Sequence, residues 1–341
     1  MLQRCSIFTA IITVAACILA PLSTVPRTLA QSPAKSTAQS AAQLPAQKKV
    51  EIFPARTLNF PVVSCMGELY RLRQEESSST LWGRQIGKKP FREARGKVSV
   101  PAGTILRLCV MYEGGENPAP LAQLNGNDIQ SLDLTRVDFN AKVGKYLGKL
   151  SRLHELTASD TEVGDTFVHD LVPLKELQCL TFNRTQVSDR GLEDLAKIKS
   201  LRILSLSNNE ISDTGISHLG SLKSLTALHL HKARLTDAGL KGLEGLSEMR
   251  YLTLTETDIS DAGLASIGKM KSLINLTIDG TKVRGPGLKS LSGLQHLASL
   301  VYSGGTVAPY CISSLKKALP RCEMTPAVAG KRSRDKVIDV Q

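Results

Sequence analysis

Residues 201–224 read LRILSLSNNEISDTGISHLGSLKS, and residues 225–248 read LTALHLHKARLTDAGLKGLEGLSE. The two segments carry apolar residues at the same first, fourth, sixth and eleventh positions. The same register, with a spacing of 24 residues, begins at Ile129, Leu153, Leu177, Leu201, Leu225, Met249, Leu273 and Leu297. Eight units in register without an insertion are typical of a repeat architecture.

Each unit predicts a strand, a turn and a short helix. The L-x-L spacing at the fourth and sixth positions is the alternation of a strand with one buried face. Segments such as SDTG (212–215) and TDAG (236–239) follow the strand. Their Ser or Thr can accept hydrogen bonds from free helix N–H groups, and their Asp suits the positive helix end. Apolar residues three apart then continue the helix: Ile216, Leu219 and Leu222.

These units predict a solenoid, because one unit cannot bury its leucine face alone whereas stacked units share a continuous core. We expect an α/β solenoid of about eight 24-residue units, with parallel strands on the concave face and short helices on the convex face. The end units diverge, as terminal repeats do. The unit at Ile129 lacks the SDxG segment, and the last unit has APYC (308–311) in its place.

Residues 249–267, MRYLTLTETDISDAGLASI, resemble a leucine-rich repeat of the variety with TDxGL after the strand, similar to the cysteine-containing kind. The resemblance covers residues 129–318. This variety is familiar from F-box substrate adaptors and from many exported bacterial proteins. The usual Asn or Cys after the strand is mostly Thr here, and we expect its hydroxyl to satisfy backbone groups in the turn. The residues at this position include Thr161, Thr185, Asn209, Ala233, Thr257 and Thr281.

The first 30 residues predict a signal peptide or a membrane anchor. Arg4 precedes an apolar run over residues 5–22, and the small residues of TLA (28–30) suit a leader protease. In a second interpretation VAAC (14–17) resembles a bacterial lipobox, which would leave Cys17 lipidated. In a third, the apolar run stays as an uncleaved anchor. All three predict an extracytoplasmic protein: secreted, periplasmic or surface-anchored.

The remaining chain divides by composition. Residues 31–49, rich in Ala, Gln, Ser and Pro, predict a disordered linker. Residues 50–128 predict a small β-rich N-terminal cap, in which GKVSVPAGTILRLCV (96–110) suggests a β-hairpin. Residues 129–325 form the predicted solenoid with its C-terminal cap, and residues 326–341 a flexible basic tail.

Five cysteines follow the leader: Cys65, Cys109, Cys179, Cys311 and Cys322. In an oxidising compartment Cys65 could pair with Cys109, and Cys311 with Cys322. The alternative is that all five are small buried thiols, and the sequence leaves both possibilities open.

The candidate binding surface is the concave sheet, where residues between the buried leucines point outward. One column reads Asp133, Thr157, Thr181, Ser205, His229, Thr253, Thr277 and Val301. A second reads Thr135, Ser159, Asn183, Ser207, His231, Thr255, Asp279 and Ser303. A third contributes Glu155, Ile203, Tyr251 and Asn275. We predict that a partner binds the centre of this surface, at Ser205, Ser207, His229, His231, Tyr251, Thr253, Thr255 and Asp279.

The sequence favours a non-catalytic protein without a cofactor or metal. His229 and His231 lie two apart on a strand and could share a metal, but no suitably placed Cys or carboxylate completes a site. The sequence contains no H-E-x-x-H, G-x-S-x-G, C-x-x-C or complete phosphate-binding loop. The repeated Asp residues, such as Asp189 and Asp213, lie at helix starts, which is a sufficient structural reason for them.

The formal net charge of +12 favours contact with an anionic partner without identifying one. Residues 56–97 carry nine Lys or Arg against four Glu. They could bind an anionic polymer, glycan or lipid headgroup. Interspersed acids and only 4% aromatic residues favour a solvated surface and argue against nucleic acid.

We therefore predict an exported protein–protein interaction module that binds a protein ligand on its concave face. The alternative is a cell-envelope or anionic-glycan-binding scaffold. An F-box-like adaptor is less favoured, because residues 50–127 show no helical segment of that kind. We expect membrane contact only through the N-terminal segment.

Overall fold

The computed structural model describes residues 53–74, 84–86, 89–112, 117–139 and 143–327. The predicted leader, the predicted linker and nearly all of the predicted basic tail lie outside these residues. Strand β15 (Glu323–Ala327) runs two residues past the predicted start of that tail. Among the described residues, no helix combines the length and the apolar character that a membrane crossing requires.

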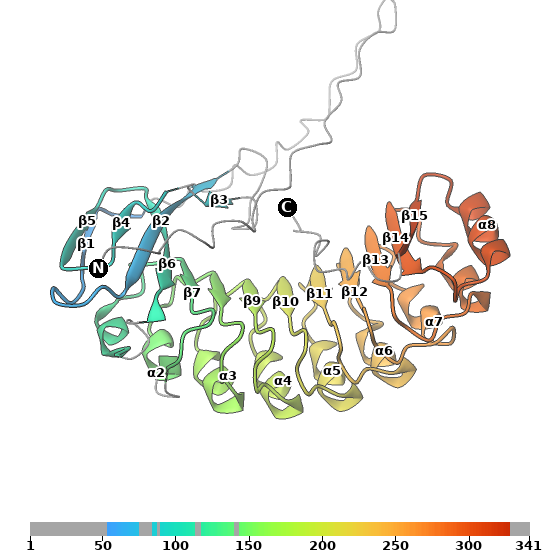
Figure 1. The fold of residues 1–341 in the computed structure, drawn as a ribbon, viewed down its shortest axis with the longest axis horizontal. Coiled ribbons are helices and arrows are strands. Elements are labelled where there is room, and N and C mark those ends of the chain that lie inside the picture. The colour runs from blue at the N-terminus through green and yellow to red at the C-terminus, as the bar shows by residue number, and fades with distance from the viewer. Residues whose placement is uncertain (1–52, 75–83, 87–88, 113–116, 140–142, 328–341) are drawn as a thin grey trace, which may run out of the picture.

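Short parallel strands line the inner side of an arc (Figure 1). Each strand pairs with the strands of the preceding and following repeats, and corresponding residues lie side by side. Leu204, for example, lies between Leu180 and Leu228. These strands are β7 (Ser131–Asp133), β8 (Glu155–Thr157), β9 (Cys179–Thr181), β10 (Ile203–Ser205), β11 (Ala227–His229), β12 (Tyr251–Thr253), β13 (Asn275–Ile278) and β14 (Ser299–Ser303). The predicted α/β leucine-rich-repeat solenoid is confirmed.

Short helices follow the strands and lie on the outer side of the arc (Figure 1). They are α2 (Val143–Leu147), α3 (Asp165–Leu171), α4 (Asp189–Leu195), α5 (Asp213–Leu219), α6 (Asp237–Leu243), α7 (Leu264–Ile267) and α8 (Pro309–Ala318), with 3-10 helices η2 (Ala119–Gln123) and η3 (Pro286–Leu291). Strand and helix leucines such as Leu204 and Leu219 are fully buried between the two layers. The leucine-rich core is therefore continuous from repeat to repeat.

The SDxG segment links consecutive repeats. Thr236 Oγ1 accepts a hydrogen bond from Ala238 N at 3.2 Å, which caps α6. Its hydroxyl also donates to Asp213 Oδ2 of the preceding repeat at 2.6 Å, and Thr236 N donates to Asp213 Oδ1 at 2.8 Å. A Cβ placed on Gly239 would lie 2.5 Å from Asp213 Oδ1. The Asp therefore joins repeats as well as suiting a helix start, and the Gly leaves room for it.

The turns after the strands use the predicted hydroxyls. Thr161, Thr257 and Thr281 each donate to the carbonyl three residues earlier, at 2.8 Å, as expected. Thr185 donates instead to Asn209 Oδ1 at 3.0 Å. One residue of each turn adopts a left-handed backbone: Arg136, Asp160, Arg184, Asn208, Lys232, Glu256 and Gly280.

The N-terminal region is built from strands β1 (Arg56–Asn59), β2 (Gly67–Gln74), β3 (Arg84–Ile86), β4 (Arg92–Glu93), β5 (Lys97–Val100) and β6 (Ile105–Val110). The prediction of a β-hairpin over residues 96–110 is wrong. Strand β5 pairs with β1, whereas β6 pairs with β2 and, in parallel, with β7. Leu108 of β6 is fully buried beside Leu132, so burial in the repeat core decides the partner of this strand.

The parallel sheet also extends at its other end, where β15 pairs with β14. The eight predicted units are therefore flanked by one more parallel strand on each side. Among the described residues, Cys65, Cys109, Cys311 and Cys322 form no disulfide bond. Neither of the two suggested disulfides is present, and Cys65, Cys179, Cys311 and Cys322 are buried thiols.

Candidate functional site

The concave face carries two rows of side chains, aligned by the strand register. Row A holds the predicted first column, from Asp133 through Ser205, His229 and Thr253 to Val301. Row B holds Ser131, Glu155, Cys179, Ile203, Ala227, Tyr251, Asn275 and Ser299. The strands therefore bring together four predicted site residues, Ser205, His229, Tyr251 and Thr253.

The centre of the concave face combines a neutral imidazole with an apolar strip. His229 Nδ1 lies 3.0 Å from Thr253 Oγ1. Burial lowers the pKa of His229 to about 4, so the ring is uncharged near neutral pH. Beside it in row B, Cys179, Ile203 and Ala227 form a small buried apolar cluster, and Tyr251 packs against them. The half-buried side chains of Ser205, Tyr251 and Thr253 around this cluster suit a partner that offers both apolar side chains and hydrogen-bonding groups.

The predicted second column lies mostly in the turns at the edge of the face, because strands β10, β11 and β12 end two residues earlier. Ser207 Oγ accepts from His231 N at 3.3 Å, and Asp279 Oδ1 accepts from Ser303 Oγ at 3.2 Å. Thr255 is only 5% exposed. Its inclusion as a surface contact was therefore wrong, whereas Ser207, His231 and Asp279 stay at the rim.

His231 and His229 have different surroundings. His231 Nε2 lies 3.8 Å from Glu256 Oε1. Burial lowers the pKa of His231, and the Glu256 carboxylate opposes that shift. Within the described part of the chain, no group of three or more His, Cys, Asp or Glu could hold a metal ion. The neighbours of this histidine pair thus include the Thr253 hydroxyl and the Glu256 carboxylate.

An ion cluster at the N-terminal end of the rows was missed from the sequence. Strand β6 adds Arg107 next to Ser131. Arg107 Nη2 lies 2.7 Å from Asp133 Oδ2, and Arg107 Nη1 lies 3.2 Å from Glu155 Oε1. Burial alone would lower the pKa of Arg107, but the two carboxylates outweigh it and raise the pKa. Burial likewise opposes ionisation of Asp133, yet Arg107 holds the pKa of this carboxyl below its usual value.

Strand β2 extends the cluster by one more strand. Tyr70 pairs with Arg107 in register, and its hydroxyl donates to Glu68 Oε2 at 2.5 Å. Burial and the neighbouring Glu68 raise the pKa of Tyr70. A signal for β6 was present in the sequence, because Ile105, Leu108 and Val110 lie one 24-residue step before Ile129, Leu132 and Leu134.

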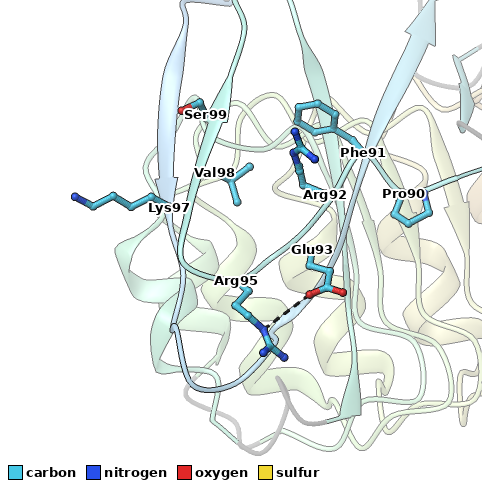
Figure 2. A pocket seen from close by; sticks show the side chains of 8 residues that line it. All are labelled: Pro90, Phe91, Arg92, Glu93, Arg95, Lys97, Val98 and Ser99. Carbon is cyan, nitrogen blue, oxygen red and sulfur yellow. Dashed lines mark ion pairs between the residues drawn. The ribbon is translucent and has the colours of Figure 1, made fainter. Parts of the chain in front are cut away.

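A second candidate site lies outside the concave face, in the N-terminal region. Figure 2 shows an open pocket beside β4 and β5. It is lined by Pro90, Phe91, Arg92, Glu93, Arg95, Lys97, Val98 and Ser99. The guanidinium of Arg71 lies 4.0 Å from the centre of the Phe91 ring. Three basic side chains and one acid give this pocket a net positive charge.

Comparison with known proteins finds one matching repeat family and several solved structures with some similarity. Residues 197–220 match the model of a family described as Leucine Rich repeat. The chain is similar in structure to internalin inlF from Listeria monocytogenes, with 21% identity, a TM-score of 0.48, and 62% of this chain and 64% of that chain covered. The similarity thus spans less than two thirds of that internalin. For internalin C2 of the same organism the identity is 22%, the TM-score 0.46 and the coverage 58% and 80%. No curated protein sequence matches this chain.

Proposed function

We propose that this leucine-rich-repeat chain is a non-catalytic binding module that holds a protein partner on its concave face. The observation that carries the proposal is the centre of that face. There, the neutral His229 and its partner Thr253 lie beside the apolar strip of row B. A surface built from many repeats sums modest contacts along an extended partner, so a large ligand suits it better than a small metabolite.

The contacts follow from the placement of the side chains. Within the strands, Ser205, His229, Tyr251 and Thr253 offer hydroxyls, an imidazole and a phenol ring. At the rim, Ser207, His231 and Asp279 offer further polar groups. Thr255 is buried and makes no contact in this proposal.

The proposal includes a location outside the cytoplasm, which rests on the sequence of residues 1–30. The alternative function, an envelope or anionic-glycan scaffold, would use the basic side chains of Arg92, Arg95 and Lys97. An F-box-like adaptor would need helices where the described residues between 56 and 110 form strands β1 to β6.

A photo-crosslinking amino acid placed at single positions tests the binding face. Position 253 lies on the concave face, and position 217 is a matched exposed control on the convex helix α5. We expect the chain expressed in its native host to give a discrete adduct from position 253, and none of that mass from position 217. An adduct from position 217 with none from positions 205 and 253 would reject the concave face as the binding surface.

A further inference from the structure

Two adjacent valines stand at the tip of the loop between β1 and β2, which we call the valine loop (residues 61–65). Val62 is 75% exposed and Val63 is 95% exposed. The residues that flank the loop, Phe60 and Met66, are buried in the core. The two valines therefore contribute almost nothing to the core of the fold, although neighbouring apolar residues do.

The valine loop is held at both ends by the same short segment. Phe60 N donates to Gly96 O at 2.8 Å, and Gly96 N donates to Pro61 O at 3.0 Å. Met66 N donates to Ala94 O at 3.1 Å. Hydrogen bonds fix both ends of the loop to residues 94–96, which we call the base of the loop. The position of the tip is therefore restrained before any partner binds.

Basic side chains surround that base. Arg95 and Lys97 flank Gly96, and together with Arg92 they line the open pocket of Figure 2, where Lys97 projects away from the ribbon. The one acid among the lining residues, Glu93, lies 3.8 Å from Arg95 Nε in an exposed pair. Such a pair is weak and leaves most of the positive field available to a partner. We call Arg92, Arg95 and Lys97 the basic collar.

A second exposed apolar pair lies at the same corner. Met111 and Tyr112 directly follow β6 and are exposed. Met111 N donates to Met66 O at 3.0 Å, which ties this pair to the end of the valine loop. Apolar side chains that gather on a surface with a polar rim mark an interaction site.

We propose that the valine loop and the basic collar dock this corner of the molecule onto an anionic lipid bilayer. The valines would enter the boundary between headgroups and acyl chains, and the collar would lie among the lipid phosphates. Apolar residues next to clustered Lys and Arg are the combination that binds such a surface.

The size of the patch favours a bilayer over a protein. A stable protein interface buries on the order of 800 Å² on each partner. The four exposed apolar side chains Val62, Val63, Met111 and Tyr112 cover less than that, whereas a bilayer requires only shallow insertion of apolar groups supported by charge. The valine loop and the proposed protein-binding residues lie on different parts of the chain. The membrane proposal can therefore be tested independently of the proposed function.

Site-specific fluorescence tests the proposal in the full chain. The single native tryptophan is removed by Trp82→Phe, and Val63→Trp places a reporter at the loop tip. Tyr310→Trp in the same background is the matched control, because Tyr310 is 71% exposed and lies on α8, at the other end of the arc (Figure 1). The predicted leader or anchor within residues 1–30 would itself add to total vesicle binding. A reporter at a stated position is therefore more informative than total binding.

With vesicles of phosphatidylcholine and phosphatidylglycerol, we expect a blue shift and quenching by brominated lipid for Val63→Trp, and neither for Tyr310→Trp. Pure phosphatidylcholine should give a much smaller effect. Adding Arg92→Gln, Arg95→Gln and Lys97→Gln should lower the apparent affinity for the anionic vesicles roughly a hundredfold, because each basic residue contributes about a fivefold gain in surface binding.

Three results would overturn the proposal. The first is an unchanged spectrum for Val63→Trp with anionic vesicles, or an equal change for Tyr310→Trp. The second is a blue shift that grows with protein concentration without vesicles, which would mean that a second copy covers the loop. The third is a response to soluble heparin but not to vesicles, which would assign the collar to an anionic glycan.

Discussion

The helix starts of the convex side and the rows of the concave face belong to the same repeats but differ in chemistry. At the helix starts the same groups recur: the N–H groups of Ser212, Thr236 and Ser260 each donate to an Asp of the preceding repeat at 2.8 Å. Row A is less regular, because Thr recurs at several positions but Ser205 and His229 interrupt it. Side chains that join repeats are repeated, whereas side chains that the backbone does not need are free to serve a partner.

Asp189→Ala should have the largest effect, because it removes a connection between repeats. Asp189 accepts from both Ser212 N and Ser212 Oγ. Losing two charge-assisted bonds and leaving an N–H without its partner should cost about 4 kcal/mol. Urea denaturation measures this loss. The matched control is Asp258→Ala, since Asp258 is half exposed and forms a surface ion pair with Lys282, and it should cost less than about 1 kcal/mol. Equal losses of stability in the two variants would show that Asp189 contributes no more than an exposed surface carboxylate.

Arg107→Met tests an exception to this comparison. Arg107 lies on the concave face, yet we expect it to stabilise the fold, because it forms ion pairs with two carboxylates. Removing the guanidinium leaves Asp133 and Glu155 partly buried without their partner, which should cost about 3 kcal/mol after allowance for their partial exposure. Arg234→Met is the control, since Arg234 is exposed and its ion pair with Glu210 is exposed as well. If both variants unfold at the same urea concentration, the ion cluster has no structural role.

The pH dependence of that loss has a defined sign. Arg107 lowers the pKa of Asp133 in the folded chain, so this contribution is present above the unfolded pKa near 4 and is lost as the pH falls below it. The difference between the natural chain and Arg107→Met should therefore shrink from pH 6 to pH 3.

The repeated part of the fold could be predicted from the sequence, because each unit states its own strand and helix locally. The strand positions, the helix starts at SDxG and the turn hydroxyls all follow from one 24-residue register. The partner of β6 was predicted wrongly, although the 24-residue register extends back to Ile105 and Leu108. Proximity in the chain favoured a hairpin with β5, but a shared core with β7, through Leu108 and Leu132, is a contact between separate segments.

The candidate site was only partly predictable. Row A and Tyr251 follow from strand alternation, and the register places them as expected. The second column does not, since a strand that ends two residues early turns Thr255 into the protein. The ion cluster of Arg107 depends on β6 joining the sheet, so no local pattern at Asp133 or Glu155 announces it.

His229 is a residue of row A whose protonation should affect the stability of the fold. Its folded pKa of about 4 lies below the unfolded value near 6.5, so the unfolded chain binds a proton first as the pH falls. Stability from the neutral ring is complete above pH 6.5 and is lost towards pH 4. Between pH 7 and pH 5 the loss should be about 2 kcal/mol. Urea denaturation of the natural chain and His229→Gln measures it, because the variant should lose less over this range. Parallel curves would show that His229 is protonated without cost.

His231→Ala should have the smallest effect on stability and thereby gives the cleanest test of function. The His231 ring is partly exposed, and its one ion-pair contact is at 3.8 Å to the exposed Glu256. Its loss should change the free energy of unfolding by less than about 0.5 kcal/mol. If the rim contacts the partner, the yield of the adduct from position 253 should fall, and the affinity for the partner so identified should drop roughly tenfold. A fall in stability with unchanged affinity would assign His231 to the fold and shift the recognition surface to the strands alone.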